Sequence, residues 1–286
     1  MKTTIISDIQ GQAKSIIPYG LRLARANEVT VDILHTIDPR KTQGTSSPYA
    51  DSQSITPGTK LSHEKIIQRE MHQARQALEK YISGEGSRLN YPLKINLVIE
   101  SETFEKSIKT MTERHPGSII VASLHPANSM VEHLDELLTL AMKLHIPAFF
   151  IPPEYPFKEL RSCMLYTDFN HKSYESLSKI TRWLTPFEPM IHAFGMEAKN
   201  DRKSLIKISS TWKKEAVSYM ESRMNLKTTI ISYGDPYQQI VDYIKRNNTE
   251  LILMPRHMIE KGSGFKLSPE LFKKAMKEIA LPTAIY

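Results

Sequence analysis

The stretch Leu93-Lys94-Ile95-Asn96-Leu97-Val98-Ile99 has the pattern of a buried strand, and a similar stretch follows 133 residues later. The second copy is Leu226-Lys227-Thr228-Thr229-Ile230-Ile231-Ser232. Each strand is followed by an acidic helix start and another apolar run, Ser118-Ile119-Ile120-Val121-Ala122 in the first copy and Leu251-Ile252-Leu253-Met254-Pro255 in the second. A solenoid unit runs about 20–50 residues, so a repeat of this length indicates a duplicated domain.

Strands and helical patterns alternate through both copies, and the strands are continuous apolar runs. This arrangement indicates a parallel sheet covered by helices on both faces, and right-handed crossovers make it doubly wound. The predicted fold class is α/β, with two tandem Rossmann-like parallel-sheet domains of five strands each. The predicted domains are residues 1–153 and 160–286, the second shorter and more basic, with a linker at 152–160.

The expected elements share apolar residues at strand or helix spacing. The expected strands are Thr3–Ile9, Val29–Ile37, Leu93–Glu100, Ser118–Ser123, Ala148–Ile151, Cys163–Phe169, Met190–Gly195, Lys227–Tyr233, Glu250–Met254 and Thr283–Tyr286. The expected helices of the first copy are Ala13–Ala26, Ser62–Ile82, Thr103–Arg114 and Met130–Leu144. The copies differ most after the second strand, where the first inserts Pro39–Leu61, a segment with little apolar content that favours a mobile loop over a lid.

The composition is ordinary for a globular protein, with 40% hydrophobic and 24% charged residues. No apolar run approaches the about 20 residues of a membrane helix, and we expect no secretory leader. The only cysteine, Cys163, excludes an internal disulfide, so we expect a cytoplasmic protein. The net charge of +7 arises after Tyr155, because 17 Lys/Arg and 17 Asp/Glu balance before it. A solvated basic surface is favoured over nucleic-acid binding.

Several motifs recur in both copies and are typical of one family. Each copy opens with a strand that ends in Asp, at Ser7-Asp8 and Thr167-Asp168, and Leu34-His35-Thr36 ends the second strand. Each copy closes with proline and an apolar strand, in His145–Ile151 and Ala280–Ile285. In these residues the chain resembles a tandem universal stress protein over almost its whole length. The resemblance implies the adenine nucleotide alpha hydrolase-like fold and a role in stress response.

The resemblance also implies an ATP site at the carboxyl ends of the strands. The Asp after the first strand would lie beside adenine, and a Gly-x2-Gly-x9-Gly-Ser/Thr loop after the fourth strand would hold the phosphates. In the first copy the corresponding residues are Asp8, His35, Ala122, Ser123 and His125. The loop from Ala122 has no glycine, and a proline removes one amide donor. We therefore expect a degenerate first site that does not bind ATP in the family manner.

The second copy also lacks the three motif glycines, since Pro255, Met258 and Ser268 stand at their spacing. Glycines and cations elsewhere in the loop offer another way to hold an anion, through backbone amides and direct charge. The alternative is a flexible, solvated basic loop, which is favoured because a lone Gly-Ser-Gly is a weak signal. The candidate nucleotide or anion site consists of Asp168, Arg256, His257, Lys261, Gly262, Gly264, Lys266 and Ser268.

Asp8 and Asp168 have two interpretations. The resemblance implies a contact with adenine, whereas the residues themselves are typical of a cap on the following helix. No cofactor is certain; ATP or another adenine nucleotide in the second domain is the one candidate.

The sequence contains none of the motifs of a P-loop, a dinucleotide fingerprint, a zinc protease or a nucleophile elbow. We therefore predict a protein that is not an enzyme and has no catalytic residue and no metal site. The leading hypothesis is a stress-response or regulatory protein with degenerate nucleotide sites. The alternative is a nucleotide-binding sensor or weak ATPase that uses the basic loop of the second domain.

The closing strands predict how the copies associate. Ala148–Ile151 and Thr283–Tyr286 each end a sheet, and unpaired strand edges invite pairing. The resemblance implies pairing through these strands, so we expect the two copies to meet each other this way as an internal pseudo-dimer. A homodimer through the same closing strands is a further expectation. No membrane partner and no nucleic acid is expected.

Overall fold

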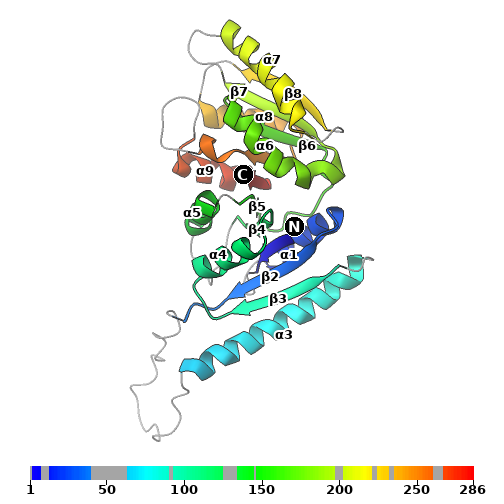
Figure 1. Ribbon diagram of the computed structural model, residues 1–286, viewed down its shortest axis with the longest axis vertical. Helices are drawn as coiled ribbons and strands as arrows, with labels where there is room; N and C mark the ends of the chain where they lie inside the picture. Colours follow the sequence, from blue (N-terminus) through cyan, green and yellow to red (C-terminus); the bar gives the residue numbers. More distant parts are fainter. Residues whose placement is uncertain are drawn as a thin grey trace, which may run out of the picture.

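The computed structural model describes residues 2–7, 13–39, 63–89, 93–124, 134–144, 146–196, 202–220, 224–231, 235–259 and 267–286 (Figure 1). Within these ranges the strands form one continuous sheet in the order β3-β2-β1-β4-β5-β10-β9-β6-β7-β8. The strands are β1 (Lys2–Ile6), β2 (Thr30–Thr36), β3 (Ile95–Glu100), β4 (Ile119–Ser123), β5 (Ala148–Ile151), β6 (Ser162–Tyr166), β7 (Met190–Met196), β8 (Asn225–Ile231), β9 (Leu251–Met254) and β10 (Thr283–Ile285).

The sheet is parallel except at its centre. β5 and β10 pair antiparallel, with Phe149 opposite Ala284, and each is parallel to its other neighbour, β4 or β9. The predicted α/β class and parallel strands are confirmed. The five predicted strands of each half are present, but they lie in one ten-stranded sheet and not in two, because the closing strands hydrogen-bond to each other.

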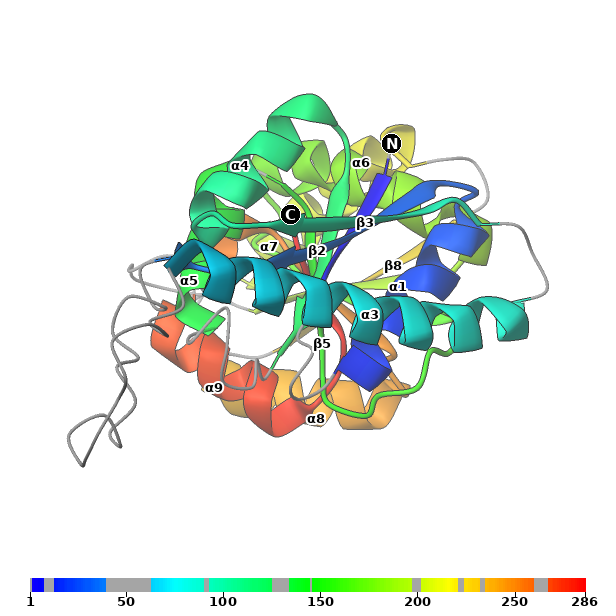
Figure 2. The ribbon, with the colours of Figure 1, turned by 90° about the horizontal axis from the view of Figure 1, so that it is seen from below.

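Helices cover both faces of the sheet. They are α1 (Ala13–Ala26), α3 (His63–Leu89), α4 (Phe104–Arg114), α5 (Leu134–Leu144), α6 (His171–Leu184), α7 (Arg202–Ser218), α8 (Pro236–Asn247) and α9 (Pro269–Ile279), with short 3₁₀ turns η1 (Thr185–Phe187) and η2 (Arg256–Met258). Figure 2 shows β2 and β3 between α4 and α1. None of the described helices is long and apolar enough to cross a membrane.

The repeated helix starts differ in their chemistry. In the second half Asp235 caps α8, because its side chain accepts a hydrogen bond from the Tyr237 amide at 3.1 Å. In the first half the cap of α4 is Thr103, which accepts from the Lys106 amide at 3.4 Å. Glu102 instead pairs with the Lys106 ammonium at 2.6 Å. The acidic start read from the sequence is therefore a cap in only one copy.

The alternating side chains of the strands fill two apolar layers. One layer packs against α1 and α6 and includes Ile16, Phe149 and Leu177, while the other packs against α4 and α8 and includes Ile108 and Ile240. Each layer contains residues of both halves. The core therefore runs through the sheet without a break at the linker.

Contacts beside the sheet also join the halves. The side-chain amide of Asn27, at the end of α1, donates to the carbonyl of Trp183 in α6 at 3.2 Å. In the connecting segment, Phe157 packs edge-on against Tyr19 of the first half, with ring centroids 5.1 Å apart, and against Phe187 of the second at 6.0 Å. Such aromatic pairs add about 0.5–1.5 kcal/mol each beyond their area burial. The predicted linker at 152–160 thus contains an apolar contact between the halves.

Cys163 lies in β6 and is fully buried. Burial raises the pKa of its thiol, with a smaller contribution from the charge of Glu250. A thiol held neutral in an apolar layer is unreactive. Cys163 therefore packs as a small hydrophobic residue of the core.

Candidate functional site

In each half the strand order reverses between the first and fourth strands, β1 and β4 in the first half and β6 and β9 in the second. In open α/β sheets, ligands bind outside the carboxyl ends of the strands at such a reversal. We call the second of these places the β6–β9 crevice, formed by residues 166–170 and 254–259. It contains Asp168, Arg256 and His257 of the second candidate site.

The first-half candidates lie at the corresponding place, but only part of the set is described. His35 is in β2, and Ala122 and Ser123 end β4; all three are buried. Ala122 packs within the apolar layer that contacts α4. Asp8 and His125 lie outside the described residues. The structure therefore gives no test of the first predicted site as a whole.

In the β6–β9 crevice the structure brings two predicted residues together. Asp168 follows β6, and His257 lies in η2 just after β9. The Oδ1 atom of Asp168 is 3.5 Å from Nε2 of His257, and their side chains are 20% and 15% exposed. The residues are 89 positions apart in the sequence, and the parallel pairing of β6 with β9 places them side by side.

The carboxylate of Asp168 also contacts Asn170. Its Oδ1 atom accepts the backbone N–H of Asn170 at 3.2 Å, and its Oδ2 atom accepts the side-chain amide at 2.5 Å. An Asp that binds the amide two residues on forms an Asx turn, here immediately before α6. The contacts of Asp168 with Asn170 therefore hold the turn before α6 and do not reach the amides of the helix itself.

Two aromatic residues close the β7 side of the crevice. Phe169 and Trp212 are 3% and 2% exposed, and their rings meet edge to face with centroids 5.4 Å apart. The indole N–H of Trp212 donates to the carbonyl of Asn170 at 3.1 Å, which fixes α7 against the turn. A cavity of about 310 Å³ lies on the outer side of this pair, lined by Phe169, Lys207, Ile208, Thr211, Trp212 and Glu215.

Phe169 reaches this position through an unusual backbone. Its φ is 57°, in the left-handed region that side chains rarely adopt. The hydroxyl oxygen of Thr167 accepts the Phe169 N–H at 2.9 Å and holds the turn. Gly195 in β7 leaves the space that the ring occupies, because a Cβ there would lie 2.9 Å from the Phe169 ring atom Cδ2.

Arg256 is a buried residue in η2, directly after β9. Its backbone N–H donates to the carbonyl of Tyr286 at 2.9 Å, and its own carbonyl accepts the N–H of Ile259 at 2.8 Å. Its side chain is largely removed from water, and this burial lowers the pKa of the guanidinium to about 10. The positive charge therefore stands in a poorly hydrated place, where it interacts strongly with any nearby anion.

The remaining second-half candidates are divided between described and undescribed residues. Lys261, Gly262, Gly264 and Lys266 lie outside the described residues. Ser268 is described, and it caps α9 by accepting the Leu271 amide at 3.2 Å. Within the described part of the chain, no group of three or more His, Cys, Asp or Glu side chains could hold a metal ion.

The cap gives a direct prediction for Ser268. Ser268→Ala is expected to lower the free energy of unfolding by about 1 kcal/mol, because the first turn of α9 loses its side-chain acceptor. Ser268→Asp retains an acceptor and is expected to stay close to the wild type. Urea unfolding followed by circular dichroism measures both. Equal stability of wild type and Ser268→Ala would contradict the cap.

Sequence reasoning missed Phe169, Asn170 and Trp212 as parts of this crevice. One signal for them was Gly195, because a glycine inside a strand often marks the close approach of another group. That signal does not name the partner, which lies 26 residues earlier in the chain.

The architecture defined by these elements is a doubly wound α/β fold in tandem, and it occurs in solved structures. A universal stress protein from Archaeoglobus fulgidus DSM 4304 aligns with 99% of this chain and 97% of its own, with a TM-score of 0.66 and 12% identity. A putative universal stress protein from Pseudomonas aeruginosa UCBPP-PA14 aligns with 99% of this chain and 92% of its own, with a TM-score of 0.51 and 9% identity.

A solved structure that is not named as a universal stress protein shares the architecture. The cytoplasmic domain of a prokaryotic cation chloride cotransporter aligns with 99% of this chain and 94% of its own, with a TM-score of 0.51 and 9% identity. No family model and no curated protein matches the sequence. The chain thus has the fold of a tandem universal stress protein, as the internal repeat and the family motifs predicted.

Proposed function

We propose that this chain is a cytoplasmic stress-response protein that is not an enzyme, that its two halves act as an internal pseudo-dimer, and that its crevices do not bind ATP in the family manner. One observation carries the proposal: the carboxylate of Asp168, which the family resemblance assigns to adenine, is already engaged. Asn170 contacts both of its oxygens, and His257 lies at 3.5 Å. Adenine would have to displace these contacts.

The surroundings of Asp168 support the same conclusion. Phe169 and Trp212 fill the space next to the turn and are almost fully buried. Exposing them costs roughly 1.5–3 kcal/mol for each large apolar side chain. A ligand that inserted there would have to recover this cost as well as the lost contacts of Asp168. The arrangement therefore favours a structural, regulatory use of the fold over nucleotide binding at this crevice.

A nucleotide sensor is the second candidate function, and Arg256 is the observation that favours it. Arg256 is buried and lies in η2, next to His257 in the chain and directly after β9. Arginine binds phosphate through two parallel hydrogen bonds, and such bonds are strong where water is scarce. In this candidate, phosphates bind at Arg256, and adenine lies elsewhere than beside Asp168.

Calorimetric titration with ATP and ADP distinguishes the two candidates. The first candidate predicts no micromolar affinity in the wild type. Micromolar binding that is lost in Asp168→Ala would contradict it and restore the family site. The second candidate predicts binding that Arg256→Ala weakens and Asp8→Ala leaves unchanged, so equal sensitivity to both substitutions would count against it.

Association between chains is a separate proposal. β5 is paired with β4 and β10, and β10 with β5 and β9. A homodimer through the closing strands would require these pairs to exchange between two chains, and it stays a prediction. Light scattering on the purified protein measures the number of chains directly.

A further inference from the structure

We propose that a second site, unrelated to the β6–β9 crevice, binds a small organic phosphate. It lies at the amino ends of the strands, whereas the β6–β9 crevice lies at their carboxyl ends. It is a cleft of about 610 Å³ at the amino ends of β4 and β5. Ser118 and Pro147, which immediately precede these strands, lie in its wall. We call it the seam cleft, because both halves of the chain contribute to it.

The first half supplies the end of α4 and the turn that follows it, and the second half supplies α6. The lining residues are Lys109, Thr112, Glu113, His115, Pro116, Gly117, Ser118, Ile146, Pro147, Ser178, Lys179, Arg182 and Trp183. In Figure 1 α4 and α6 belong to different parts of the ribbon, with β4 and β5 between them. Ligand sites commonly have volumes of about 300–1,000 Å³ and lie between domains.

Positive charge dominates the seam cleft. Lys109, Lys179 and Arg182 line it, against a single carboxylate, Glu113. Among the described residues, none of these three cations forms an ion pair. Gathering like charges around one concave surface raises their mutual repulsion, and a bound anion removes that cost. The formal charge of three cations and one carboxylate is +2, which matches a phosphate dianion.

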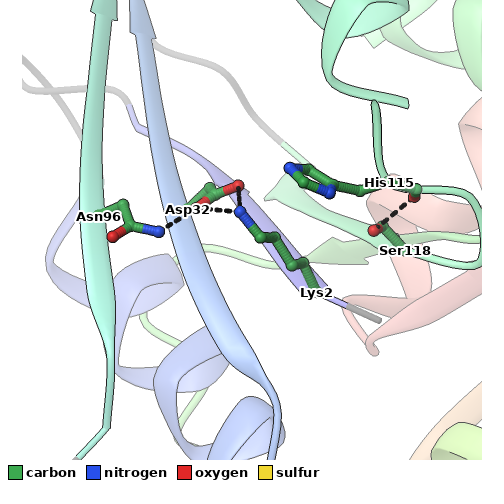
Figure 3. Close-up of polar contacts among 5 residues, drawn as sticks. All are labelled: Lys2, Asp32, Asn96, His115 and Ser118. Carbon is green, nitrogen blue, oxygen red and sulfur yellow. Dashed lines mark hydrogen bonds and ion pairs between the residues drawn. The ribbon is translucent and has the colours of Figure 1, made fainter. Parts of the chain in front are cut away.

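The turn between α4 and β4 forms a fixed wall of the cleft. Gly117 has a φ of 81°, and the Ser118 hydroxyl donates to the carbonyl of His115 at 2.7 Å. Figure 3 shows this bond and the imidazole of His115 directed toward Lys2 and Asp32. The turn therefore has a defined conformation, with a glycine at the one position where the backbone requires it.

The nearby ammonium of Lys2 does not add to the free charge of the cleft. Its Nζ atom lies 2.9 and 3.2 Å from the two carboxylate oxygens of Asp32, which is almost completely buried. Asn96 donates a further hydrogen bond to Asp32 at 2.8 Å (Figure 3). This cluster is internally neutral. The charge available to a ligand therefore comes from α4 and α6.

The apolar residues that line the seam cleft indicate what kind of group the phosphate is attached to. Trp183, Ile146 and Pro147 form an apolar part of the wall, and the volume exceeds what inorganic phosphate needs. Arg182 and Lys179 provide the charge-assisted donors that bind phosphate oxygens. A phosphorylated small molecule with a compact organic group satisfies both parts of the lining.

Calorimetric titration of the full chain with inorganic pyrophosphate tests the phosphate part of the site. The wild type is expected to bind saturably, and the double substitution Lys179→Ala/Arg182→Ala to weaken binding by about tenfold or more. The matched control is Lys245→Ala/Arg246→Ala, which removes the same charge from exposed positions of α8. Higher salt is expected to weaken binding in the wild type, because it screens exposed charges.

Arg256→Ala separates the seam cleft from the β6–β9 crevice, because binding at the seam cleft depends on Lys179 and Arg182 and persists when Arg256 is removed. The proposal is overturned by an absence of saturable binding up to ~10 mM, by equal weakening in the α8 control, or by loss of binding in Arg256→Ala alone. Saturation by an oligonucleotide without any binding of pyrophosphate would also overturn it. Circular dichroism of each variant shows that the fold is retained.

Discussion

Phe149→Ala is expected to lower the free energy of unfolding by about 3–5 kcal/mol. Phe149 is fully buried in β5, directly opposite Ala284 of β10, and packs in the layer that contains α1 and α6. Truncation leaves a cavity at the one place where the two halves hydrogen-bond strand to strand, and the small Ala284 cannot fill it. Urea unfolding, followed by tryptophan fluorescence and circular dichroism, gives the change.

The two probes add a test of how the halves unfold. Trp183 and Trp212 both lie in the second half, whereas circular dichroism reports on the whole chain. Since the sheet and both apolar layers cross the seam, we expect one transition with coincident midpoints in the wild type. Tyr219→Ala is the aromatic control, because Tyr219 is 43% exposed, and it is expected to change stability by less than about 0.5 kcal/mol. A loss as small as this in Phe149→Ala would contradict the packing described here.

Gly195→Ala has the second largest expected effect, a loss of about 1–3 kcal/mol. A Cβ on this residue would lie 2.9 Å from the carbonyl oxygen of Thr167 and would collide with the ring of Phe169. The turn after β6 has little room to move, because the Thr167 hydroxyl and the Trp212 indole both hold it. Thermal unfolding of the variant measures the loss.

A double-mutant cycle identifies the source of the effect. Phe169→Ala removes the ring but leaves the Thr167 carbonyl in place. Gly195→Ala should therefore cost less in the Phe169→Ala background than in the wild type, with a coupling of about 0.5–3 kcal/mol. Gly20→Ala is a useful comparison, since the atoms nearest its Cβ would be side-chain atoms of Ile5 and Val121 and not a backbone oxygen. Strict additivity of Gly195→Ala and Phe169→Ala would show that the ring is not the obstacle.

The order and type of the elements could be predicted because strands such as β5 and β9 are continuous apolar runs that alternate with helical patterns. β5 matched its expected bounds, as did α1. The end of α3 could not, since the helix was expected to end at Ile82 and continues to Leu89, past Gly84 and Gly86. A glycine inside a helix costs only about 1 kcal/mol relative to alanine, and Gly84 has no neighbour within 4 Å that would restrict it.

The candidate site was less accessible to sequence reasoning. The place of Asp168 after β6 and of His257 after β9 could be predicted, because the strand that each residue follows fixes its position. It could not predict that Asn170 contacts both carboxylate oxygens or that Trp212 packs on Phe169. Those contacts depend on the positive φ of Phe169 and on the placement of α7, whose Trp212 lies 42 residues after Asn170. Sequence patterns carry little information about such long-range side-chain pairs.

The antiparallel pair of β5 and β10 has a consequence for how this architecture responds to dilution. Two separate chains that met through the same strands would come apart as their concentration fell. Here the peptide chain itself holds the strands together, and the tether between β5 and β6 keeps the local concentration of one half around the other near the millimolar range typical of short linkers. The central pairing should therefore persist at any protein concentration, including that of a scarce cellular component.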